Sequence, residues 1–216
     1  MCFSANASFG AGVFLTTIGV IATKNVNNNK QILFASIPFL FGIQQFTEGI
    51  LWLSLAPPFN YKLQYLATYL FLIIAQIIWP IIIPLAIYLK DKNKQYHKIQ
   101  LMLISIGIIV SGYLIFCIST FKVEAKIVGM HILYNESFPP QFHNLSGLLY
   151  IIATATMPLL SDNKMTRYLG ITILASYFFT KKFYSGFEIS VWCFFASIIS
   201  LYILIIILEE NKKSLQ

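Results

Sequence analysis

The chain consists of long apolar stretches separated by short polar gaps. Seven apolar segments can be drawn, at residues 8–23, 31–56, 64–89, 99–120, 145–160, 168–182 and 187–208. A helix of about 20 mostly apolar residues spans the hydrocarbon core of a bilayer, so each segment is expected to cross a membrane. The pattern therefore predicts an all-α, polytopic membrane protein: a single domain over residues 1–216 built as a bundle of about seven transmembrane helices.

The short lengths of three segments leave the number of spans open. The first, fifth and sixth segments have only about 16 apolar residues, so six or eight spans are alternatives to seven. Residues 121–144 form the only long gap, which we expect to be a loop on the outward side. Within it the run from Ile127 to Tyr134 is apolar, which indicates a segment that packs back against the helices.

Composition supports the bilayer as the solvent and main partner of the chain. Apolar residues make up 57% of the sequence and charged residues only 11%, against about 25% charged residues in soluble domains. The net charge of +7 does not indicate nucleic acid, because the basic residues lie at the ends of the apolar segments. Ten of the 15 Lys and Arg residues follow the first, third, fifth and last segments, which predicts an outer N-terminus and a cytoplasmic C-terminus.

Polar residues inside the second segment are the strongest sign of a site. Gln44, Gln45 and Glu48 lie past the middle of residues 31–56, where a carboxylate facing lipid is costly. Their spacing, with Trp52 one turn further on, places them on one broad helical face. Either they tie helices together by hydrogen bonds, or Glu48 works as a ligand, proton carrier or general base that the two glutamines orient.

Further metal-ligating residue types fall on the same side of the membrane if the chain has seven spans. These are Cys2, His131 in the long gap, and Cys193 near the start of the last segment. Carboxylate, imidazole and thiolate groups are ligands of zinc and other transition metals. Cys2, Glu48, His131 and Cys193 therefore form a hypothetical metal site, and His131 is also a candidate catalytic residue beside Glu48.

Other residues are expected to line this pocket or to pack around it. Trp52 and Gln76 lie in the second and third segments, and Glu188 and Trp192 begin the last one. Pro80 bends the third segment, which either opens a cavity beside the second segment or only shapes packing. Small residues every three or four positions in the last segment are typical of a helix-packing seam: Ser190, Cys193 and Ser197.

Three classes of function fit these features. The first is a membrane-embedded enzyme that acts on a lipid or small molecule in a polar, metal-binding pocket in the outward half of the bundle. The second is a small transporter, channel or receptor with Glu48 as a proton or ion site. The third is a structural or partner-binding helix bundle in which the polar groups only pack.

Several motifs resemble an uncharacterised family of bacterial multi-pass membrane proteins that begin Met-Cys-Phe-Ser-Ala. The similar stretches are MCFSANASFG, FGIQQFTEGILW, the segment around His131, and SVWCFFAS. The resemblance covers nearly the whole chain and implies a bacterial cytoplasmic (inner) membrane location. It implies family signature residues at Cys2, Ser4, Gln44, Gln45, Glu48, Trp52, His131, Trp192 and Cys193.

Overall fold

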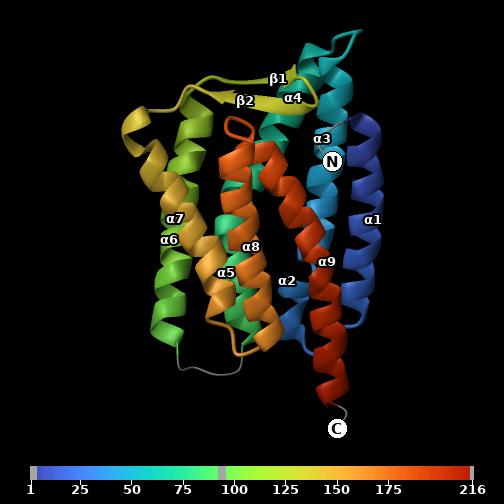
Figure 1. Ribbon diagram of the computed structural model, residues 1–216, viewed down its shortest axis with the longest axis vertical. Helices are drawn as coiled ribbons and strands as arrows, with labels where there is room; N and C mark the ends of the chain where they lie inside the picture. The colour runs from blue at the N-terminus through green and yellow to red at the C-terminus, as the bar shows by residue number, and fades with distance from the viewer. Residues whose placement is uncertain (1–3, 92–95, 215–216) are drawn as a thin grey trace.

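The computed structural model describes residues 4–91 and 96–214, which form seven helical rods and one β-hairpin (Figure 1). The chain begins near the end of the bundle that carries the hairpin, here called the hairpin end, and finishes at the opposite, far end. In chain order the rods are α1 (Ala5–Lys24); η1 (Asn29–Gln31), α2 (Ile32–Ala35) and α3 (Ile37–Leu55); α4 (Tyr61–Leu72), the π-helix η2 (Ile73–Ile78) and α5 (Trp79–Lys90); α6 (His97–Thr120); α7 (Pro140–Leu159); α8 (Lys164–Phe183); and α9 (Glu188–Ser214).

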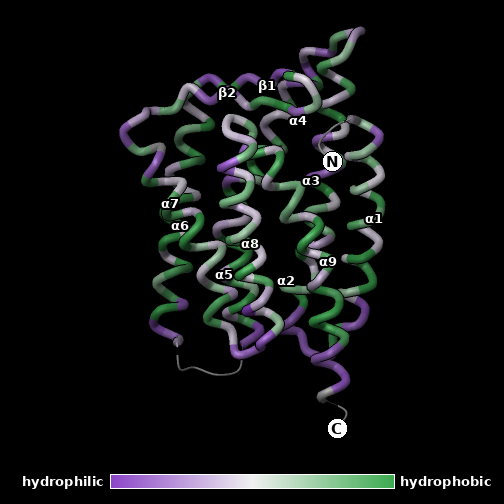
Figure 2. The backbone as a smooth tube through the Cα atoms, in the orientation of Figure 1, coloured by the Kyte–Doolittle hydropathy of each residue, from purple (hydrophilic) through white to green (hydrophobic). Residues whose placement is uncertain are grey.

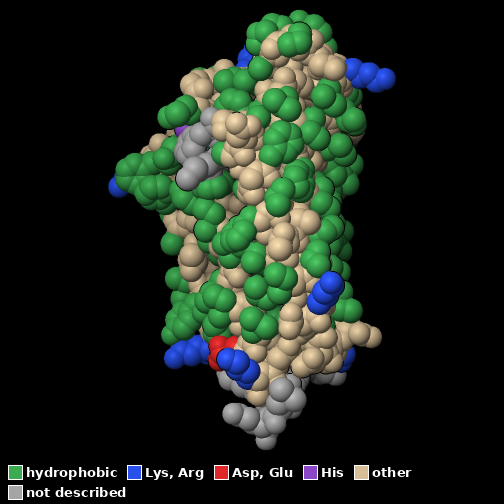
Figure 3. All heavy atoms as spheres, turned by 90° about the vertical axis from the view of Figure 1, so that its right-hand side faces the viewer, with side chains coloured by type: hydrophobic (Ala, Val, Ile, Leu, Met, Phe, Trp, Pro, Cys, Tyr) green, Lys and Arg blue, Asp and Glu red, His purple; other side chains and the backbone are tan. Residues whose placement is uncertain are grey.

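The outside of the bundle is apolar over most of its length. Figure 2 shows hydrophobic positions along the middle of the helices and hydrophilic positions toward the two ends. Figure 3 shows one face covered largely by hydrophobic side chains, with Lys and Arg mostly near its ends. Among the described residues, four helices are long and apolar enough to cross a membrane: α1, the continuous Tyr61–Lys90 rod, α6 and α9. The structure therefore supports a membrane location for the chain.

Three helices are longer than the apolar segments from which they were predicted. α1, α7 and α8 each contain 20 residues, whereas the apolar pattern predicts about 16. At α8 the extra turn comes from the polar residues after Asn163, whose side chain caps the helix by accepting a hydrogen bond from Met165 N (2.8 Å). These helices extend beyond the apolar segments because hydropathy falls where polar residues begin, while backbone hydrogen bonding continues through them.

The stretch at residues 121–144 is not the loop that the sequence predicts, and the fold is not purely helical. Its first part forms an antiparallel hairpin of β1 (Val123–Val128) and β2 (His131–Glu136), and α7 begins at Pro140. The turn uses Gly129 with φ of +62°, a conformation that glycine adopts without strain. Of the apolar run from Ile127 to Tyr134, only the part on β2 is buried, at Ile132 and Tyr134, whereas Ile127, Val128 and Met130 are exposed. Buried side chains alternate along the strands at Val123, Ala125, Ile132 and Tyr134.

A π-helix interrupts the α4–α5 rod just before Pro80. Proline has no N–H, so carbonyl groups in the preceding turn lose their usual donor. Two neighbouring helices supply donors instead: Tyr150 OH donates to Ala75 O (2.6 Å), and Ser111 Oγ donates to Ile77 O (2.8 Å). The interruption is therefore stabilised by α6 and α7, and it turns Gln76 and Trp79 toward the interior, where both are buried.

Candidate functional site

The polar residues of α3 are buried inside the bundle. Gln44, Gln45 and Glu48 are each 0% exposed, and Trp52 is 8% exposed. α3 packs against α1, α4 and α9, which together screen its polar face from the outside. Because no polar group of these side chains reaches lipid, their cost to stability depends on the partners they find within the bundle.

Glu48 meets the start of α9. Ser190 Oγ donates a hydrogen bond to Glu48 Oε1 at 2.8 Å. Cys193 lies one turn further along α9, and its thiol is beside the Gln44 side chain and close to the Glu48 carboxylate. Three of the predicted site residues, Gln44, Glu48 and Cys193, are therefore brought together by the contact between α3 and α9.

Gln44 also connects the cluster to α5. Its Oε1 accepts a hydrogen bond from Trp79 Nε1 at 2.8 Å. The Trp79 ring stacks on Phe41, with 4.0 Å between ring centroids. Sequence reasoning missed Trp79 as a site residue; the available signal was an indole in the middle of an apolar segment, which needs a buried hydrogen-bond acceptor.

The Gln45 amide differs from its neighbours. Within the part of the chain that the structure describes, neither its Oε1 nor its Nε2 makes a hydrogen bond, although both atoms are buried. Trp52 Nε1 is in the same condition within those residues. An unsatisfied buried polar group costs about 1–3 kcal/mol. Hydrogen bonding between helices therefore accounts for the burial of Gln44 and Glu48 better than for the burial of Gln45.

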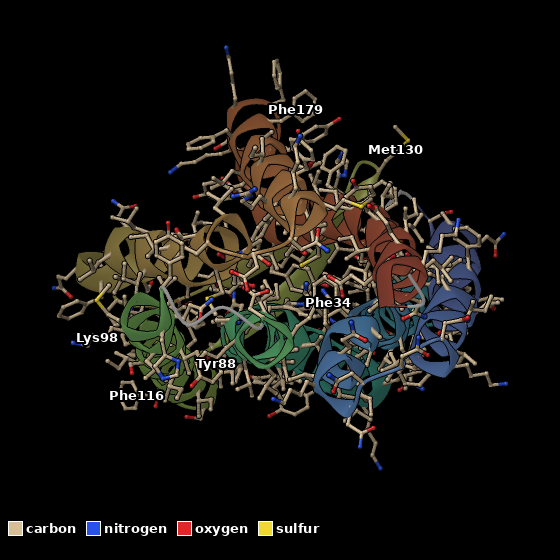
Figure 4. All side chains as sticks on the ribbon, turned by 90° about the horizontal axis from the view of Figure 1, so that it is seen from below. Phe34, Tyr88, Lys98, Phe116, Met130 and Phe179 are labelled. Atoms are coloured by element: carbon tan, nitrogen blue, oxygen red, sulfur yellow. The ribbon has the colours of Figure 1, made fainter. Side chains whose placement is uncertain are left out.

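An apolar cavity runs from this polar cluster toward the far end. It has a volume of about 40 Å³ and lies among α2, α3, α5, α7, α8 and α9. Phe41, Trp79, Tyr150, Trp192 and Cys193 line it near the polar cluster, and Phe34, Ile87, Pro158, Leu169 and Ile203 line it further away. Figure 4, which views the bundle from the far end, shows Phe34 directed to the interior while Phe116 and Phe179 point outward.

The dimensions of the cavity suit a narrow, extended occupant. A cavity of roughly 10–15 Å³ is large enough for one water molecule, so this cavity is several times larger than one water molecule requires. Its lining on α9 extends from Trp192 to Ile203, which corresponds to about 16 Å along the helix at 1.5 Å per residue. The cavity is thus long, thin and apolar, with polar chemistry at one end.

A second carboxyl, half-buried, lies under the hairpin. Glu136, the last residue of β2, accepts a hydrogen bond from Gln76 Nε2 at 2.5 Å. Burial raises the pKa of Glu136 to about 7, and the Gln76 bond lowers it only in part. Sequence reasoning missed Glu136 because it lies in a stretch that was interpreted as a loop. The hairpin therefore places a carboxyl that titrates near neutral pH inside the hairpin end.

His131, the histidine predicted for the site, begins β2 and packs against the turn between α8 and α9. The His131 ring contacts the rings of Tyr184 and Phe187, with centroids 5.5 and 5.1 Å away. Burial lowers the pKa of His131, so the neutral imidazole is favoured. Cys2 lies outside the described residues. Among residues 4–91 and 96–214, no three His, Cys, Asp or Glu side chains are grouped closely enough to hold a metal ion. The metal site stays a hypothesis.

Glu188 and Trp192, both predicted to line or pack around the pocket, lie in different environments. Glu188 lies at the first turn of α9, where its carboxylate accepts a hydrogen bond from Gly186 N (2.7 Å) at the surface. Trp192 instead lines the cavity, and its Nε1 donates to Ser176 Oγ at 3.2 Å. Tyr150 also lines the cavity and was missed by sequence reasoning, because a tyrosine within an apolar segment is indistinguishable from an ordinary packing residue.

Comparison with curated proteins and with solved structures finds no match. The match to a protein-family model covers residues 1–215 and thus nearly the whole chain. This confirms the resemblance to an uncharacterised family that the motifs indicate. The chain belongs to the family described as a family of unknown function (DUF6629).

Proposed function

We propose that this chain is a seven-span protein of the bacterial cytoplasmic membrane that binds a molecule with one apolar chain. The apolar chain would lie in the cavity, and the polar part of the molecule would lie at the cluster of Gln44, Glu48, Ser190 and Cys193. The observation that carries the proposal is a long apolar cavity lined at one end by Cys193, whose thiol lies beside the Gln44 side chain and within electrostatic range of the buried Glu48 carboxylate.

Seven spans are supported by the lengths and surfaces of the three remaining rods. α3 has 19 residues and continues from α2, and α7 and α8 have 20 residues each. The low hydropathy of α3 comes largely from Gln44, Gln45 and Glu48, which are buried and do not face lipid. Outward positions on these rods carry large apolar residues such as Leu53, Leu148 and Phe178.

The orientation rests on the basic residues. Ten of the 15 Lys and Arg residues follow the first, third, fifth and last apolar segments in the sequence, and the helices of those segments end at the far end. The positive-inside rule then favours a cytoplasmic far end, an outer hairpin end, and an N-terminus outside with the C-terminus inside. In this orientation the polar cluster lies in the outward half of the bundle.

The shape of the cavity favours an amphipathic occupant over a small polar solute. Most of the lining is aliphatic or aromatic, so a fully polar molecule would lose its hydration without compensation. A hydrocarbon chain would instead bury apolar surface along the length of the cavity. Among the lining residues, Cys193 adjoins the buried hydrogen-bonding groups of the α3–α9 contact, so we place the head of such a molecule at that end.

The proposal is tested by filling the cavity. Ala196 lines the cavity on α9, whereas Ile198 on the same helix is 47% exposed. We expect Ala196→Phe to remove single-chain lipids that co-purify with the protein, measured by native mass spectrometry, and Ile198→Phe to leave them in place. Retention of the same lipids by Ala196→Phe, with folding intact by circular dichroism, would show that the cavity is not the binding site.

The same samples distinguish a binding or transport protein from an enzyme. If the bound molecule is recovered unchanged after incubation, the chain acts as a binding or transport protein. If it is recovered as a product, and Glu48→Gln stops that conversion while keeping the molecule bound, then the membrane-embedded enzyme is the correct class, with Glu48 in direct contact with the reacting group.

A further inference from the structure

We infer that the cavity selects an uncharged lipid: its occupant is a single hydrocarbon chain whose head is a neutral oxygen group, such as a hydroxyl, placed at Cys193. This inference rests on the proposed function and names the ligand class of the same cavity. The juxtaposition that supports it is a lining without charged side chains and a thiol at one end of that lining.

The lining offers no partner to a charged head group. Among the described residues, the side chains that line the cavity include no Lys, Arg, His, Asp or Glu. An ammonium or a carboxylate placed there would lose its hydration without an opposite charge to replace it, which costs far more than burying a neutral polar group. The composition of the lining therefore disfavours charged heads of either sign.

The charged groups just outside the lining are engaged within the protein. Glu48 does not line the cavity; it is 0% exposed, and its carboxylate accepts the hydrogen bond from Ser190 Oγ (2.8 Å). At the other end, Lys90 is paired with Glu210 (2.8 Å), and its Nζ lies 5.2 Å from the centre of the Phe34 ring. Because Phe34 lines the cavity and Lys90 does not, an occupant meets the ring and not the ammonium group. Neither end therefore supplies a counter-charge.

The polar hydrogens on the lining are almost all donated within the protein. The donor and acceptor pairs are Trp79 Nε1 and Gln44 Oε1 (2.8 Å), Tyr150 Oη and Ala75 O (2.6 Å), Thr154 Oγ1 and Tyr150 O (2.8 Å), Trp192 Nε1 and Ser176 Oγ (3.2 Å), and Ser200 Oγ and Ser197 O (2.6 Å). Among the described lining residues, these bonds leave the Cys193 thiol as the polar group that can still donate its hydrogen. Cys193 is within electrostatic range of Tyr150, so this thiol lies at the aromatic end of the cavity.

Gln44 orients that thiol from behind. The Gln44 side chain lies beside the Cys193 thiol, and its Oε1 is already held by Trp79. Its Nε2 is buried and makes no hydrogen bond within the described part of the chain. Because an amide N–H group is a donor, it favours the sulfur as acceptor and directs the S–H hydrogen away from the amide. A thiol is a weak and neutral donor, which suits a neutral oxygen acceptor at this end of the cavity.

The rest of the lining explains why the neutral head would carry a chain. From Cys193 the α9 lining continues through Ala196 and Ile199 to Ile203, and all three are apolar. A single alkyl chain buries apolar surface along this row. We therefore expect the chain to supply most of the affinity, a neutral oxygen to add to it modestly, and a charge on the head to weaken binding.

The experiment compares ligands that share a chain and differ in head-group charge. The probe is 4-bromododecan-1-ol, whose bromine atom quenches tryptophan fluorescence at short range. It is applied to the Trp52→Phe protein in nanodiscs of zwitterionic lipid, so that Trp79 and Trp192 report. Dodecanol, dodecyltrimethylammonium and dodecanoate, the last ionised at alkaline pH, are then added as competitors at known mole fractions of the nanodisc lipid. We expect saturable quenching, and displacement by dodecanol at mole fractions about tenfold or more below those needed for either charged ligand.

Cys193→Val tests where the head lies. Valine is similar in size to cysteine but has no S–H donor. We expect the affinity for the alcohol probe to fall about threefold or more, while the affinity for 4-bromododecane, which has no head group, stays the same. Cys117→Val is the matched control, because Cys117 on α6 is also buried but does not line the cavity. The competition series leaves the lining unchanged, so the test of charge does not depend on the folding of either variant.

The outcomes distinguish the two proposals. Competition by dodecyltrimethylammonium or dodecanoate that equals or exceeds competition by dodecanol would overturn the neutral head and keep a lipid-binding cavity. An unchanged affinity for the alcohol probe in Cys193→Val would place the head elsewhere and also overturn the inference. Quenching that is not saturable, or that is unchanged by Ala196→Phe, would overturn the cavity proposal itself.

Discussion

Ser190 on α9 donates a hydrogen bond to Glu48 on α3 at 2.8 Å, between residues that are 142 positions apart in the chain. Both residues are 0% exposed. This bond joins Glu48, the one carboxylate of α3, to the helix that supplies Cys193 and Trp192 to the cavity. The contact therefore links the stability of the α3–α9 packing to the chemistry of the site.

Ser190→Ala is expected to destabilise the protein by about 1–3 kcal/mol, because it leaves a buried carboxylate with one donor fewer. The control is Ser197→Ala on the same helix, where the hydroxyl bonds only to the carbonyl of Phe194 within α9 (2.7 Å). Thermal unfolding in detergent should show a clear loss for Ser190→Ala and a small change for Ser197→Ala. Equal losses would mean that the bond to Glu48 does not stabilise the fold.

Docking of the hairpin should depend on pH through Glu136. The pKa of Glu136 is raised from its ordinary 4.5 to about 7 by burial. The docked state therefore favours the protonated carboxyl, so its stability is greatest below the unfolded pKa and is lost as pH rises through about 7. We expect the apparent melting temperature to fall between pH 5 and 8 by an amount that Glu136→Gln removes.

Glu124→Gln is the control for the pH effect. Glu124 lies on the other strand and forms surface ion pairs with Lys122 (2.6 Å) and Lys126 (3.2 Å), which lower its pKa. Glu124→Gln should leave the fall in melting temperature between pH 5 and 8 unchanged. If the same fall persists in Glu136→Gln, the group that titrates is not Glu136.

The convergence of Glu48, Gln44 and Cys193 could be predicted because polar groups within an apolar segment must find partners inside the bundle. The seven rods were also predictable, since apolar length alone defines them. The hairpin was missed although its signal was present: Val123 and Ala125 alternate with Glu124 and Lys126, a period of two that is typical of a strand.

Of the aromatic residues that line the cavity, Trp192 was predicted to line the pocket and Trp79 carried a signal, but Phe41 and Tyr150 could not be predicted. Both lie in apolar segments, and nothing local distinguishes a side chain that faces a cavity from one that faces lipid or packs in the core. Their convergence depends on which helices are neighbours, and that is set by packing between residues far apart in sequence. Glu136 was missed for a related reason, because its burial requires the hairpin to fold over Gln76.

The far end of the bundle depends on a network centred on Glu210. Its carboxylate accepts hydrogen bonds from Gln31 (2.7 Å), Lys90 (2.8 Å) and Asn163 (2.5 Å), which come from three other parts of the chain. Lys90→Met should cost up to about 3 kcal/mol, because it leaves a partly buried acid without its cation, and Lys90→Met with Glu210→Leu should cost less than the sum. A double-mutant cycle of unfolding free energies checks this.

A surface ion pair serves as the control for that double-mutant cycle. Lys122→Met removes an ion pair whose lysine side chain is 77% exposed, and exposed pairs contribute about 0–1 kcal/mol. It should change stability little. Additive single and double effects at Lys90 and Glu210 would mean that the two residues contribute independently and that the network does not act as a unit.

The close approach of α6 to the π-helix can be tested at two glycines of the same helix. A Cβ added at Gly107 would lie 1.9 Å from Pro80 O, a backbone atom, whereas one added at Gly112 meets nothing within 4 Å. Gly107→Ala must therefore push α6 away from the α4–α5 rod, at a cost of about 1–3 kcal/mol or more. Gly112→Ala is expected to be neutral or to stabilise α6 slightly. Because the π-helix holds Gln76 and the adjoining Trp79 in place, Gly107→Ala should also lower the amount of single-chain lipid that co-purifies with the protein, while Gly112→Ala should not. Equal unfolding temperatures for the two variants would show that this contact is not tight in the folded protein.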